Sequence, residues 1–435
     1  MKVLVIGFTD AGRRTCAAFE NQNVDVVHVA NPTDVQLKEI LENGVDGVAV
    51  MLHNDIEVLR YSLAIEHIKP GIKLVVAIFD RSVRHEIENS IPNVTVASPA
   101  FVSIPSIVAS ALDLQGDAIL RTEHSNKPDL KLFNLSAEPA IEAKFEVPIT
   151  WKWWRLKALL RGQFVSYDSA SKALLGSFFG LMAIFIIDIL ILKKSEKLSH
   201  AFYSAAAVIS GVSAPHSPVE EWQAFQSGFF MLVTIVLVAI FGAGMVNHIL
   251  TGRQVGLIGK RVIPKGQHVI VVGLGQVGIR LCKEFKLLNV SVVAVEKSPF
   301  SPGITLARDL NIPVLIGDAS EVRTLKKCNL SNSKALLAMG SAEQDNIGVA
   351  VAARSLNKKI PIVIRAGNND AIAETKSLFS IGGICDVNGL TAAFVSQSIT
   401  GNEPQVVANI ETTIKILTQD RNLISVASPG RCECN

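Results

Sequence analysis

The sequence predicts an α/β protein with an α-helical membrane segment in its middle. Valine- and isoleucine-rich strands alternate with helices in residues 1–114 and again in residues 267–402. Such buried, continuous strands are typical of parallel sheets that helices cover on both faces. Two apolar runs of about twenty residues each lie between these regions. The two α/β regions also match one another, so we expect two copies of one domain on either side of a two-span membrane module.

The first domain, residues 1–114, is predicted to be a Rossmann-like unit. An apolar strand from Val3 to Ile6 runs into the glycine turn Gly7–Gly12, and a helix follows. Because this opening is a strand that ends in a turn, we expect no signal peptide. Further strands are predicted at 24–29, 47–52 and 73–79, and the helices run up to Glu20, over 34–42 and over 56–68.

Two connecting segments come next. Residues 115–150 carry three prolines and show no sustained period, which predicts an extended linker. Residues 151–172 open with the tryptophan- and base-rich stretch Trp151–Arg161. Such residues just ahead of an apolar run are typical of a short helix at the membrane–water interface, so we expect membrane lipid as a partner.

The membrane module, residues 173–250, contains two predicted spans. Ala173–Leu192 is apolar except at Asp188, and Ser227–Asn247 carries no charge. At about 1.5 Å of rise per residue, each is long enough for a bilayer core. Between them, Ala201–Pro215 predicts a short re-entrant helix followed by a sharp loop. A loop at membrane depth has to line a water-filled path or be buried in protein. The alternative is a plain two-helix anchor with an external loop.

Basic residues give the orientation of this module. They gather before the first span and after the second, whereas three lysines between the spans are offset by three glutamates. The positive-inside rule therefore predicts a multi-pass protein with both termini in the cytoplasm. A net charge of +3 is too small to indicate nucleic-acid binding. The flanking basic residues are Lys152, Arg155, Lys157, Arg161 and Lys172, then Arg253, Lys260, Arg261 and Lys265.

The second α/β domain, residues 267–402, follows a linker of residues 251–266 and precedes a tail of residues 403–435. Shifting the first domain by 266 positions lays it over the second. The first copy is expected to lack the third strand. The matched pairs are Gly7 with Gly273, Gly12 with Gly278, Arg14 with Arg280, Cys16 with Cys282, Phe19 with Phe285, and Asn23-Val24 with Asn289-Val290.

The second copy carries a dinucleotide-binding pattern. The loop Gly273–Gly278 follows a strand and opens a helix, and Glu296 ends the next strand. Gly275 lets backbone approach a phosphate, Gly278 lets the helix pack on the sheet, and the helix N-terminus donates N–H groups. Glu296 can accept from ribose hydroxyls and repels a 2′-phosphate. We therefore expect NAD(H) or an adenine nucleotide (ATP, ADP or AMP) rather than NADP(H). For the glycines, the alternative is a purely structural strand-to-helix turn.

Other residues at the same sheet edge complete the predicted site: Gln276, Val277, Arg280, Asp318, Ala319 and Arg365. For both arginines a surface ion pair is an equal alternative to phosphate binding. In the first copy, Thr9 replaces the middle glycine and Ala30 replaces the acid, so we expect that copy to be mainly structural. Six cysteines without framework spacing are typical of reduced cytosolic thiols, and Cys432-x-Cys434 alone is weak support for a metal site.

As a set, these motifs resemble the RCK (KTN, or TrkA N-terminal) nucleotide-binding domains of potassium channels and transporters. The residues concerned are Gly273–Gly278, Glu296, Gly317-Asp-Ala319, Asp345-Asn346 and Ile364-Arg-Ala366. The spans and re-entrant segment resemble the pore module of those channels, although there the pore precedes the RCK domains. The resemblance implies a homotetramer in which eight α/β units form a gating ring around a path for monovalent cations.

The filter departs from the family pattern. Aligning the re-entrant helix places Ser210, Gly211, Val212, Ser213, Ala214 and Pro215 there. Potassium channels carry a segment like Thr-Val-Gly-Tyr-Gly, whose carbonyls replace the hydration shell of the ion. Ser213 and Pro215 stand at glycine positions; proline fixes φ near about −65° and serine rarely adopts positive φ. We therefore expect weak potassium selectivity.

The second span contains Gly242 and Gly244 near its cytoplasmic end, and we expect them to form a gating bend. Residues 246–248 would then line the cytoplasmic mouth. Close helix packing in lipid is an equally good reason for small residues at these positions.

Together these features predict a tetrameric cation channel gated by cytoplasmic nucleotide-binding domains, and not an enzyme. We find no clear substrate domain after the second α/β unit and no convincing catalytic acid–base set. One alternative is a non-conducting, nucleotide-sensing membrane regulator of ion transport, which the altered filter favours. A less favoured alternative is a membrane-anchored NAD-dependent oxidoreductase.

Overall fold

The computed structural model describes residues 1–78, 81–122, 129–137, 139–145, 169–192, 197–210, 221–250, 263–366, 383–410 and 413–432. The chain divides into two compact units. One consists of residues 1–160 and 263–435 and contains both α/β domains. The other, residues 161–262, contains the membrane segment.

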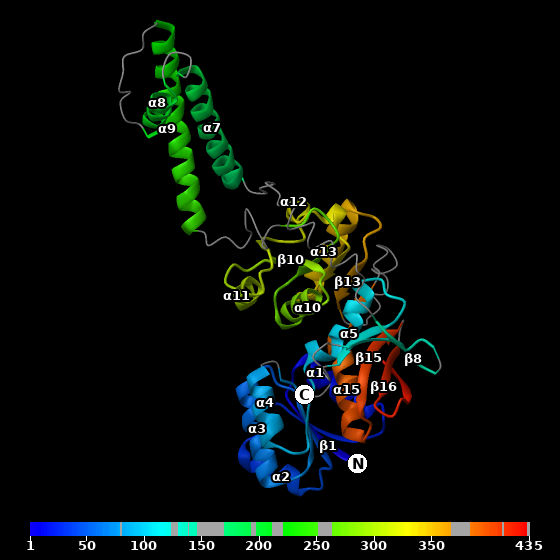
Figure 1. Cartoon of the computed structure of the whole chain (residues 1–435). Coiled ribbons are helices and arrows are strands. Elements are labelled where there is room, and N and C mark those ends of the chain that lie inside the picture. Colours follow the sequence, from blue (N-terminus) through cyan, green and yellow to red (C-terminus); the bar gives the residue numbers. More distant parts are fainter. Residues whose placement is uncertain are drawn as a thin grey trace. The chain divides into compact units, whose positions relative to one another are not determined.

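The N-terminal domain is built on a parallel sheet in the order β2-β1-β3-β4-β5. It is coloured blue to cyan in Figure 1, where β1 and several of its helices are labelled. Its strands are β1 (Lys2–Ile6), β2 (Asp25–Val29), β3 (Gly47–Val50), β4 (Lys73–Val76) and β5 (Val94–Val96). Its helices are α1 (Asp10–Glu20), α2 (Asp34–Glu42), α3 (Asp55–Ile68), α4 (Arg81–Ser90) and α5 (Pro99–Ala111). Alternate strand residues enter two cores. Leu4 and Val48 pack with α2, α3 and α4 on one face, and Val3 and Ala49 pack with α1 on the other.

The second α/β domain has a parallel sheet in the order β11-β10-β9-β12-β13-β14. The strands are β9 (His268–Val272), β10 (Ser291–Glu296), β11 (Val314–Ile316), β12 (Ala335–Ala338), β13 (Ile362–Arg365) and β14 (Gly383–Cys385). The helices are α10 (Gln276–Leu287), α11 (Pro302–Asp309), α12 (Val322–Lys327), the 3₁₀ turn η1 (Leu330–Asn332), α13 (Glu343–Leu356) and α15 (Val387–Thr400). This order puts the carboxyl ends of β9, β10, β12 and β13 along one edge.

The internal repeat is confirmed in backbone and core. Phe19 and Phe285 are both fully buried, and Asn23 and Asn289 both adopt positive φ. The predicted loss of the third strand from the first copy is also confirmed among the described residues. In the first copy β2 is the edge strand of its sheet. Its counterpart in the second copy, β10, pairs on its outer side with a further strand, β11.

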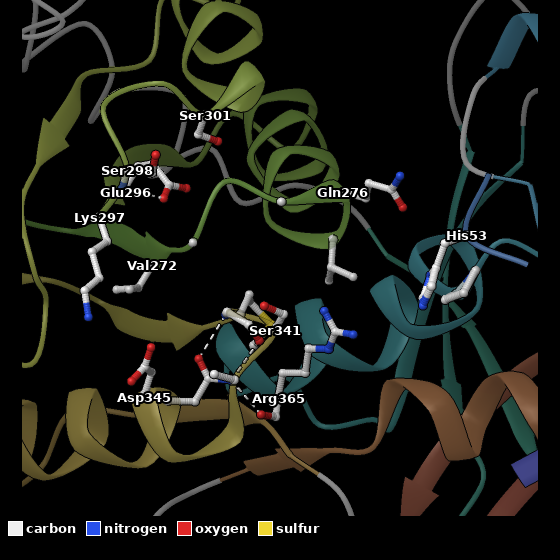
Figure 2. Close-up of a pocket in the computed structure, with 18 of the residues that line it drawn as sticks. His53, Val272, Gln276, Glu296, Lys297, Ser298, Ser301, Ser341, Asp345 and Arg365 are labelled. Atoms are coloured by element: carbon white, nitrogen blue, oxygen red, sulfur yellow. Dashed lines mark hydrogen bonds between the residues drawn. The ribbon is translucent and has the colours of Figure 1, made fainter. Parts of the chain in front are cut away.

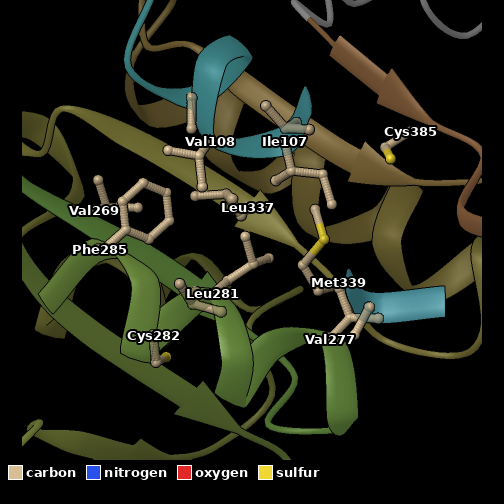
Figure 3. Packing of buried hydrophobic residues seen from close by; sticks show 14 of the residues in the cluster. Ile107, Val108, Val269, Val277, Leu281, Cys282, Phe285, Leu337, Met339 and Cys385 are labelled. Carbon is tan, nitrogen blue, oxygen red and sulfur yellow. The ribbon is translucent and has the colours of Figure 1, made fainter. Parts of the chain in front are cut away.

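The two copies exchange one helix each. α5 follows the first sheet in sequence, but its Ile107 packs with Leu281 and Phe285 of the second domain (Figure 3). α15 follows the second sheet, but its Val395 and Ile399 pack on the α1 face of the first sheet. Each sheet is therefore covered in part by a helix from the other copy, which joins the two domains into one unit.

The predicted linker of residues 115–150 and tail of residues 403–435 are corrected by the structure. The described parts of each segment form a three-stranded antiparallel sheet, and the two sheets share a core that contains Phe133 and Val406. These strands interleave polar with apolar residues, so they lack the continuous valine- and isoleucine-rich runs that indicate a buried parallel strand. The strands are β6 (Ala118–Thr122), β7 (Asp129–Asn134) and β8 (Ile141–Lys144), then β15 (Pro404–Ile410), β16 (Thr413–Thr418) and β17 (Leu423–Ala427).

The membrane segment forms three helices, α7 (Ser169–Leu192), α8 (Leu198–Ser210) and α9 (Glu221–Leu250). α8 lies against α7 through an edge-to-face contact of Phe185 and Phe202, with ring centroids 5.4 Å apart. Among the described residues, one stretch, Gly228–Val246 of α9, is long and apolar enough to cross a membrane. The apolar part of α7, Gly176–Ile191, is shorter. The predicted helices are present, and the double crossing stays a prediction.

Several predicted features lie outside the described residues. These are the interfacial stretch Trp151–Arg161, the filter residues Gly211–Pro215, the linker up to residue 262 and the helix from Asp370.

Candidate functional site

A cleft of about 900 Å³ opens at the carboxyl edge of the second parallel sheet (Figure 2). Ligands of open α/β sheets bind in this position, outside the carboxyl ends of the strands. The predicted residues that line it are Gly273, Gly275, Gln276, Val277, Glu296, Asp318, Ala319 and Arg365. The volume is within the usual range for small-molecule and cofactor sites, roughly 300–1,000 Å³.

The three glycines of the loop have different physical roles. Gly273 has φ +86°, and a Cβ there would lie 2.9 Å from the backbone nitrogen of Gly340. At Gly278 a Cβ would lie 1.9 Å from the carbonyl oxygen of Gly273, so this residue lets α10 start directly against the turn. At Gly275, the N-cap of α10, a Cβ would meet no described heavy atom within 4 Å. Of the three glycines, Gly275 is therefore the one beside open space in the cleft.

Glu296 ends β10 beside the glycine loop. Its Oε2 accepts a hydrogen bond of 2.7 Å from Leu274 N, and its Oε1 accepts one of 3.1 Å from Ser298 N. These bonds fix the carboxylate at the cleft edge, and its remaining lone pairs are available to hydroxyl donors.

Asp318 lies at the next strand end and pairs with Lys297 at 2.9 Å. This lysine, together with the hydroxyl and backbone N–H of Ser320, lowers the pKa of Asp318 to about 2, so its carboxylate is ionised at neutral pH. An ionised acid that already has a cation is suited to hydroxyl donors and unsuited to phosphate.

Arg365 brings a cationic side chain to the cleft. It ends β13, and its guanidinium points into the cleft on the side that faces His53 (Figure 2). Burial lowers the pKa of Arg365 from its usual value. Among the described residues, no hydrogen bond to this guanidinium is present. A partly desolvated guanidinium whose donors have no partner among the described residues is suited to bind phosphate.

Asn346 was not predicted as a site residue, although its dipeptide was part of the family pattern. It is 2% exposed. Its Oδ1 accepts from Gly340 N at 2.9 Å, and its Nδ2 donates to the carbonyl oxygens of Gly340 and Arg365. Asn346 thus joins the ends of β12 and β13 and sets the floor of the cleft.

The opposite wall comes from the other copy, which sequence motifs could not reveal. It contains Thr9, Asp10, Met51, Leu52, His53 and Ala77 of the first domain, together with Asn388 of α15. Thr9 caps α1: its hydroxyl accepts from Gly12 N at 3.0 Å and donates to Met51 O at 2.6 Å. The residue that replaces the middle glycine of the first copy therefore has a structural role.

Two predicted residues do not line the cleft. Gly278 lies inside the turn, and Arg280 donates to Ser98 Oγ at 3.0 Å. Ser98 is the N-cap of the exchanged helix α5. In the first copy, Arg14 likewise contacts Asp386, the N-cap of α15, at 2.6 Å. Each of these repeat-related arginines thus holds the helix that the other copy donates.

In the membrane segment, Ser210 ends α8 and donates to Ala207 O at 3.1 Å. α9 is continuous through Gly242 and Gly244. A Cβ at Gly244 would lie 3.1 Å from Leu174 of α7, whereas a Cβ at Gly242 would meet no described atom within 4 Å. Gly244 thus lets α9 pack closely against α7, whereas the space beside Gly242 contains no described atom.

Comparisons with known proteins agree with this reading of the second domain. Residues 269–381 match the TrkA-N domain family. The chain is 29% identical over 106 residues to potassium channel protein 1 of Methanocaldococcus jannaschii. The matched region covers 24% of this chain and 32% of that protein. It is 26% identical over 150 residues to an uncharacterized protein of Methanothermus fervidus, covering 34% and 23%. The chain therefore matches less than a third of the length of each of these relatives.

Among solved structures, the crystal structure of the GsuK RCK domain is similar to the chain with a TM-score of 0.50 at 11% identity. The match covers 99% of this chain and 89% of that chain. At this identity the similarity concerns the fold alone.

Proposed function

We propose, from the membership of this chain in the potassium-channel-like family that carries RCK (TrkA-N) domains, that it is a cation channel gated by nucleotide binding. One observation carries the proposal: the nucleotide cleft has one wall from each copy of the repeat. A ligand held between two domains can change how they sit together. The membrane helix α9 ends at Leu250 and β9 of the second domain begins at His268. A movement of that domain would therefore reach α9 through a short segment of the chain.

The proposed ligand is NAD(H) or another adenine nucleotide. Its phosphates would lie at the N-terminus of α10, over Gly275, with Arg365 as counter-charge. Ribose hydroxyls would donate to Glu296. A dinucleotide is favoured over a mononucleotide because the cleft continues past Arg365 to His53 and Asn388. These residues would contact the second half of the molecule.

Gating follows from differential affinity. A ligand shifts an open–closed equilibrium only by the difference in its affinity for the two states. Residues of the first domain form one wall of the cleft and residues of the second form the other, so only one relative position of the two domains satisfies both sets of contacts. We propose that this position favours one state of a homotetrameric pore lined by α8, α9 and the filter segment.

Reconstitution of the full chain in planar bilayers tests the function. We expect cation currents whose open probability changes on adding NAD(H) and whose potassium-over-sodium preference is weak under bi-ionic conditions. We propose Gly242 as the gating bend, because a Cβ there would meet no described atom within 4 Å, so Gly242→Ala should alter gating more than Gly244→Ala. Strong potassium selectivity would contradict the inference from Ser213 and Pro215. Nucleotide binding without any current would support the non-conducting regulator, which the same two residues favour.

Glu296→Ala tests the nucleotide site. We expect NAD(H) binding to weaken by about 1–3 kcal/mol, roughly 5- to 150-fold, because ribose hydroxyls lose their acceptor. Calorimetry on the full chain in detergent, with NAD⁺, NADH, ATP, ADP and AMP, measures it. Asp309→Ala, an exposed acid of the same domain outside the cleft lining, is the matched control. Equal affinities in both variants, or no binding of any of these nucleotides by the parent, would refute the assignment.

A further inference from the structure

Two cysteines and one histidine meet at the first domain, and none of the three lines the nucleotide cleft. They are Cys16 of α1, His28 of β2 and Cys432, which follows β17. Their ligand atoms all lie within 4.8 Å of one another, and Cys432 Sγ is 3.4 Å from His28 Nδ1. Cys16 is 1% exposed and Cys432 is 6% exposed. Sequence spacing links Cys432 only with Cys434, because Cys16 and His28 lie about four hundred residues away in the chain.

We propose that Cys16, His28 and Cys432 bind a zinc ion. Thiolate sulfur and imidazole nitrogen are donors that Zn²⁺ prefers, and these residues supply three of the four ligands of a tetrahedral site, with the fourth position left to water. With Zn–S near 2.3 Å and Zn–N near 2.0–2.1 Å, ligand atoms lie roughly 3.5–3.8 Å apart, so the cluster needs only a small contraction. The proposal rests on these three residues. Cys434, two positions on, lies outside the described residues.

The histidine is oriented as a metal ligand requires. Its Nε2 lies 3.0 Å from the carbonyl oxygen of Gly7, which can only accept, so Nε2 carries the proton. Nδ1 is therefore the unprotonated nitrogen, and it is the atom that faces Cys432. A backbone carbonyl that holds the far nitrogen of a ligating histidine is a regular feature of zinc sites. The ring of Phe8 packs edge-on against the imidazole, with centroids 4.6 Å apart.

The third ligand is held in place by the chain around it. Cys432 N donates to Arg13 O at 3.2 Å, and Arg431 pairs with Asp10. Two thiols would lose their protons on binding, and the two thiolates would neutralise the charge of the ion. The ion would fasten the segment after β17 to α1 and β2. Because Asp10 also lines the nucleotide cleft, the same segment adjoins that site.

The second copy of the repeat supplies a natural contrast. Cys282 is the counterpart of Cys16, and Ala294 stands where the first copy has His28. Cys282 is fully buried in an apolar core, which raises its pKa to about 12. The same helix position thus carries a ligand candidate in one copy and a packing residue in the other.

The test uses the full chain in detergent with a thiol reductant, and Zn²⁺ or Co²⁺ as probe. We expect one equivalent of either ion to bind, with a thiolate-to-cobalt charge-transfer band. Cys432→Ser and His28→Gln should each weaken binding by more than the roughly 10–100-fold that loss of an outer hydrogen-bond partner costs. Cys432 lies beyond the last strand, so its variant has little reason to misfold. Cys282→Ser is the matched control and should bind as the parent does.

Three results would overturn the proposal. The parent could give no charge-transfer band at one equivalent of cobalt. Cys432→Ser could bind Zn²⁺ as tightly as Cys282→Ser. Mass spectrometry after alkylation in fresh extracts could find Cys16 and Cys432 joined as a disulfide, which would leave no thiolates for a metal.

Discussion

Replacing Asp386 with alanine is expected to destabilise the packing of α15 on the first domain by about 3 kcal/mol. Asp386 is 2% exposed and accepts from Arg14 at 2.6 Å, from Gly389 N at 2.9 Å and from Ser428 Oγ at 3.2 Å. Asp386 is the closer and more buried of the two carboxylates that pair with Arg14, the other being Asp10 at 3.2 Å. Its loss therefore removes the main counter-charge of Arg14 and also the N-cap of α15. Hydrogen exchange of the α15 amides in the full chain measures the effect, and we expect exchange to be roughly a hundred-fold faster or more.

Two further variants separate the causes of this loss. Asp386→Asn keeps an acceptor for Gly389 N but not the charge, so it should remove the ion-pair contribution and spare the helix cap. Glu42→Ala breaks an exposed pair with Lys38 and should change stability by less than about 1 kcal/mol. If α15 exchanges no faster in Asp386→Ala than in Glu42→Ala, Arg14 and Asp386 do not hold the exchanged helix.

Gly278→Ala is expected to destabilise the second domain by about 3 kcal/mol and to abolish nucleotide binding. Its Cβ would lie 1.9 Å from the carbonyl oxygen of Gly273, a backbone atom that can move only if the turn and α10 separate. Thermal unfolding of the full chain and calorimetry with NAD(H) give the two readouts. Unchanged stability would show that the turn is softer than the contact distance implies.

Gly275→Ala is the matched variant and should have the opposite signature. Its φ of −68° suits alanine, and the new Cβ would meet no described atom within 4 Å. Stability should stay the same or rise by up to about 1 kcal/mol. NAD(H) affinity should fall about tenfold or more, because the methyl group occupies the space that we assign to a phosphate. Unchanged affinity would place the phosphates elsewhere.

Local pattern was enough to predict most elements of the two sheets. The helix predicted at 34–42 matches α2, whose Thr33 and Gln36 form a capping box. The glycine loop and Glu296 were predicted because each acts within a few residues of a strand end. The strands β6–β8 and β15–β17 were missed, because they interleave polar with apolar residues and lack the continuous apolar runs of the parallel strands.

The sequence by itself determined the α/β repeat, the apolar helices of the membrane segment and the glycine-rich side of the nucleotide cleft. Each of these features depends on residues that are close together in the sequence, through a repeating pattern of apolar residues or a fixed spacing between motif residues. Only the tertiary structure decided which helix covers which sheet, which residues form the far wall of the cleft and which cysteines meet His28. Arg14 and Asp386 are 372 positions apart. A contact over such a distance leaves no period in the chain, because it depends on how whole domains pack and not on where neighbouring side chains point.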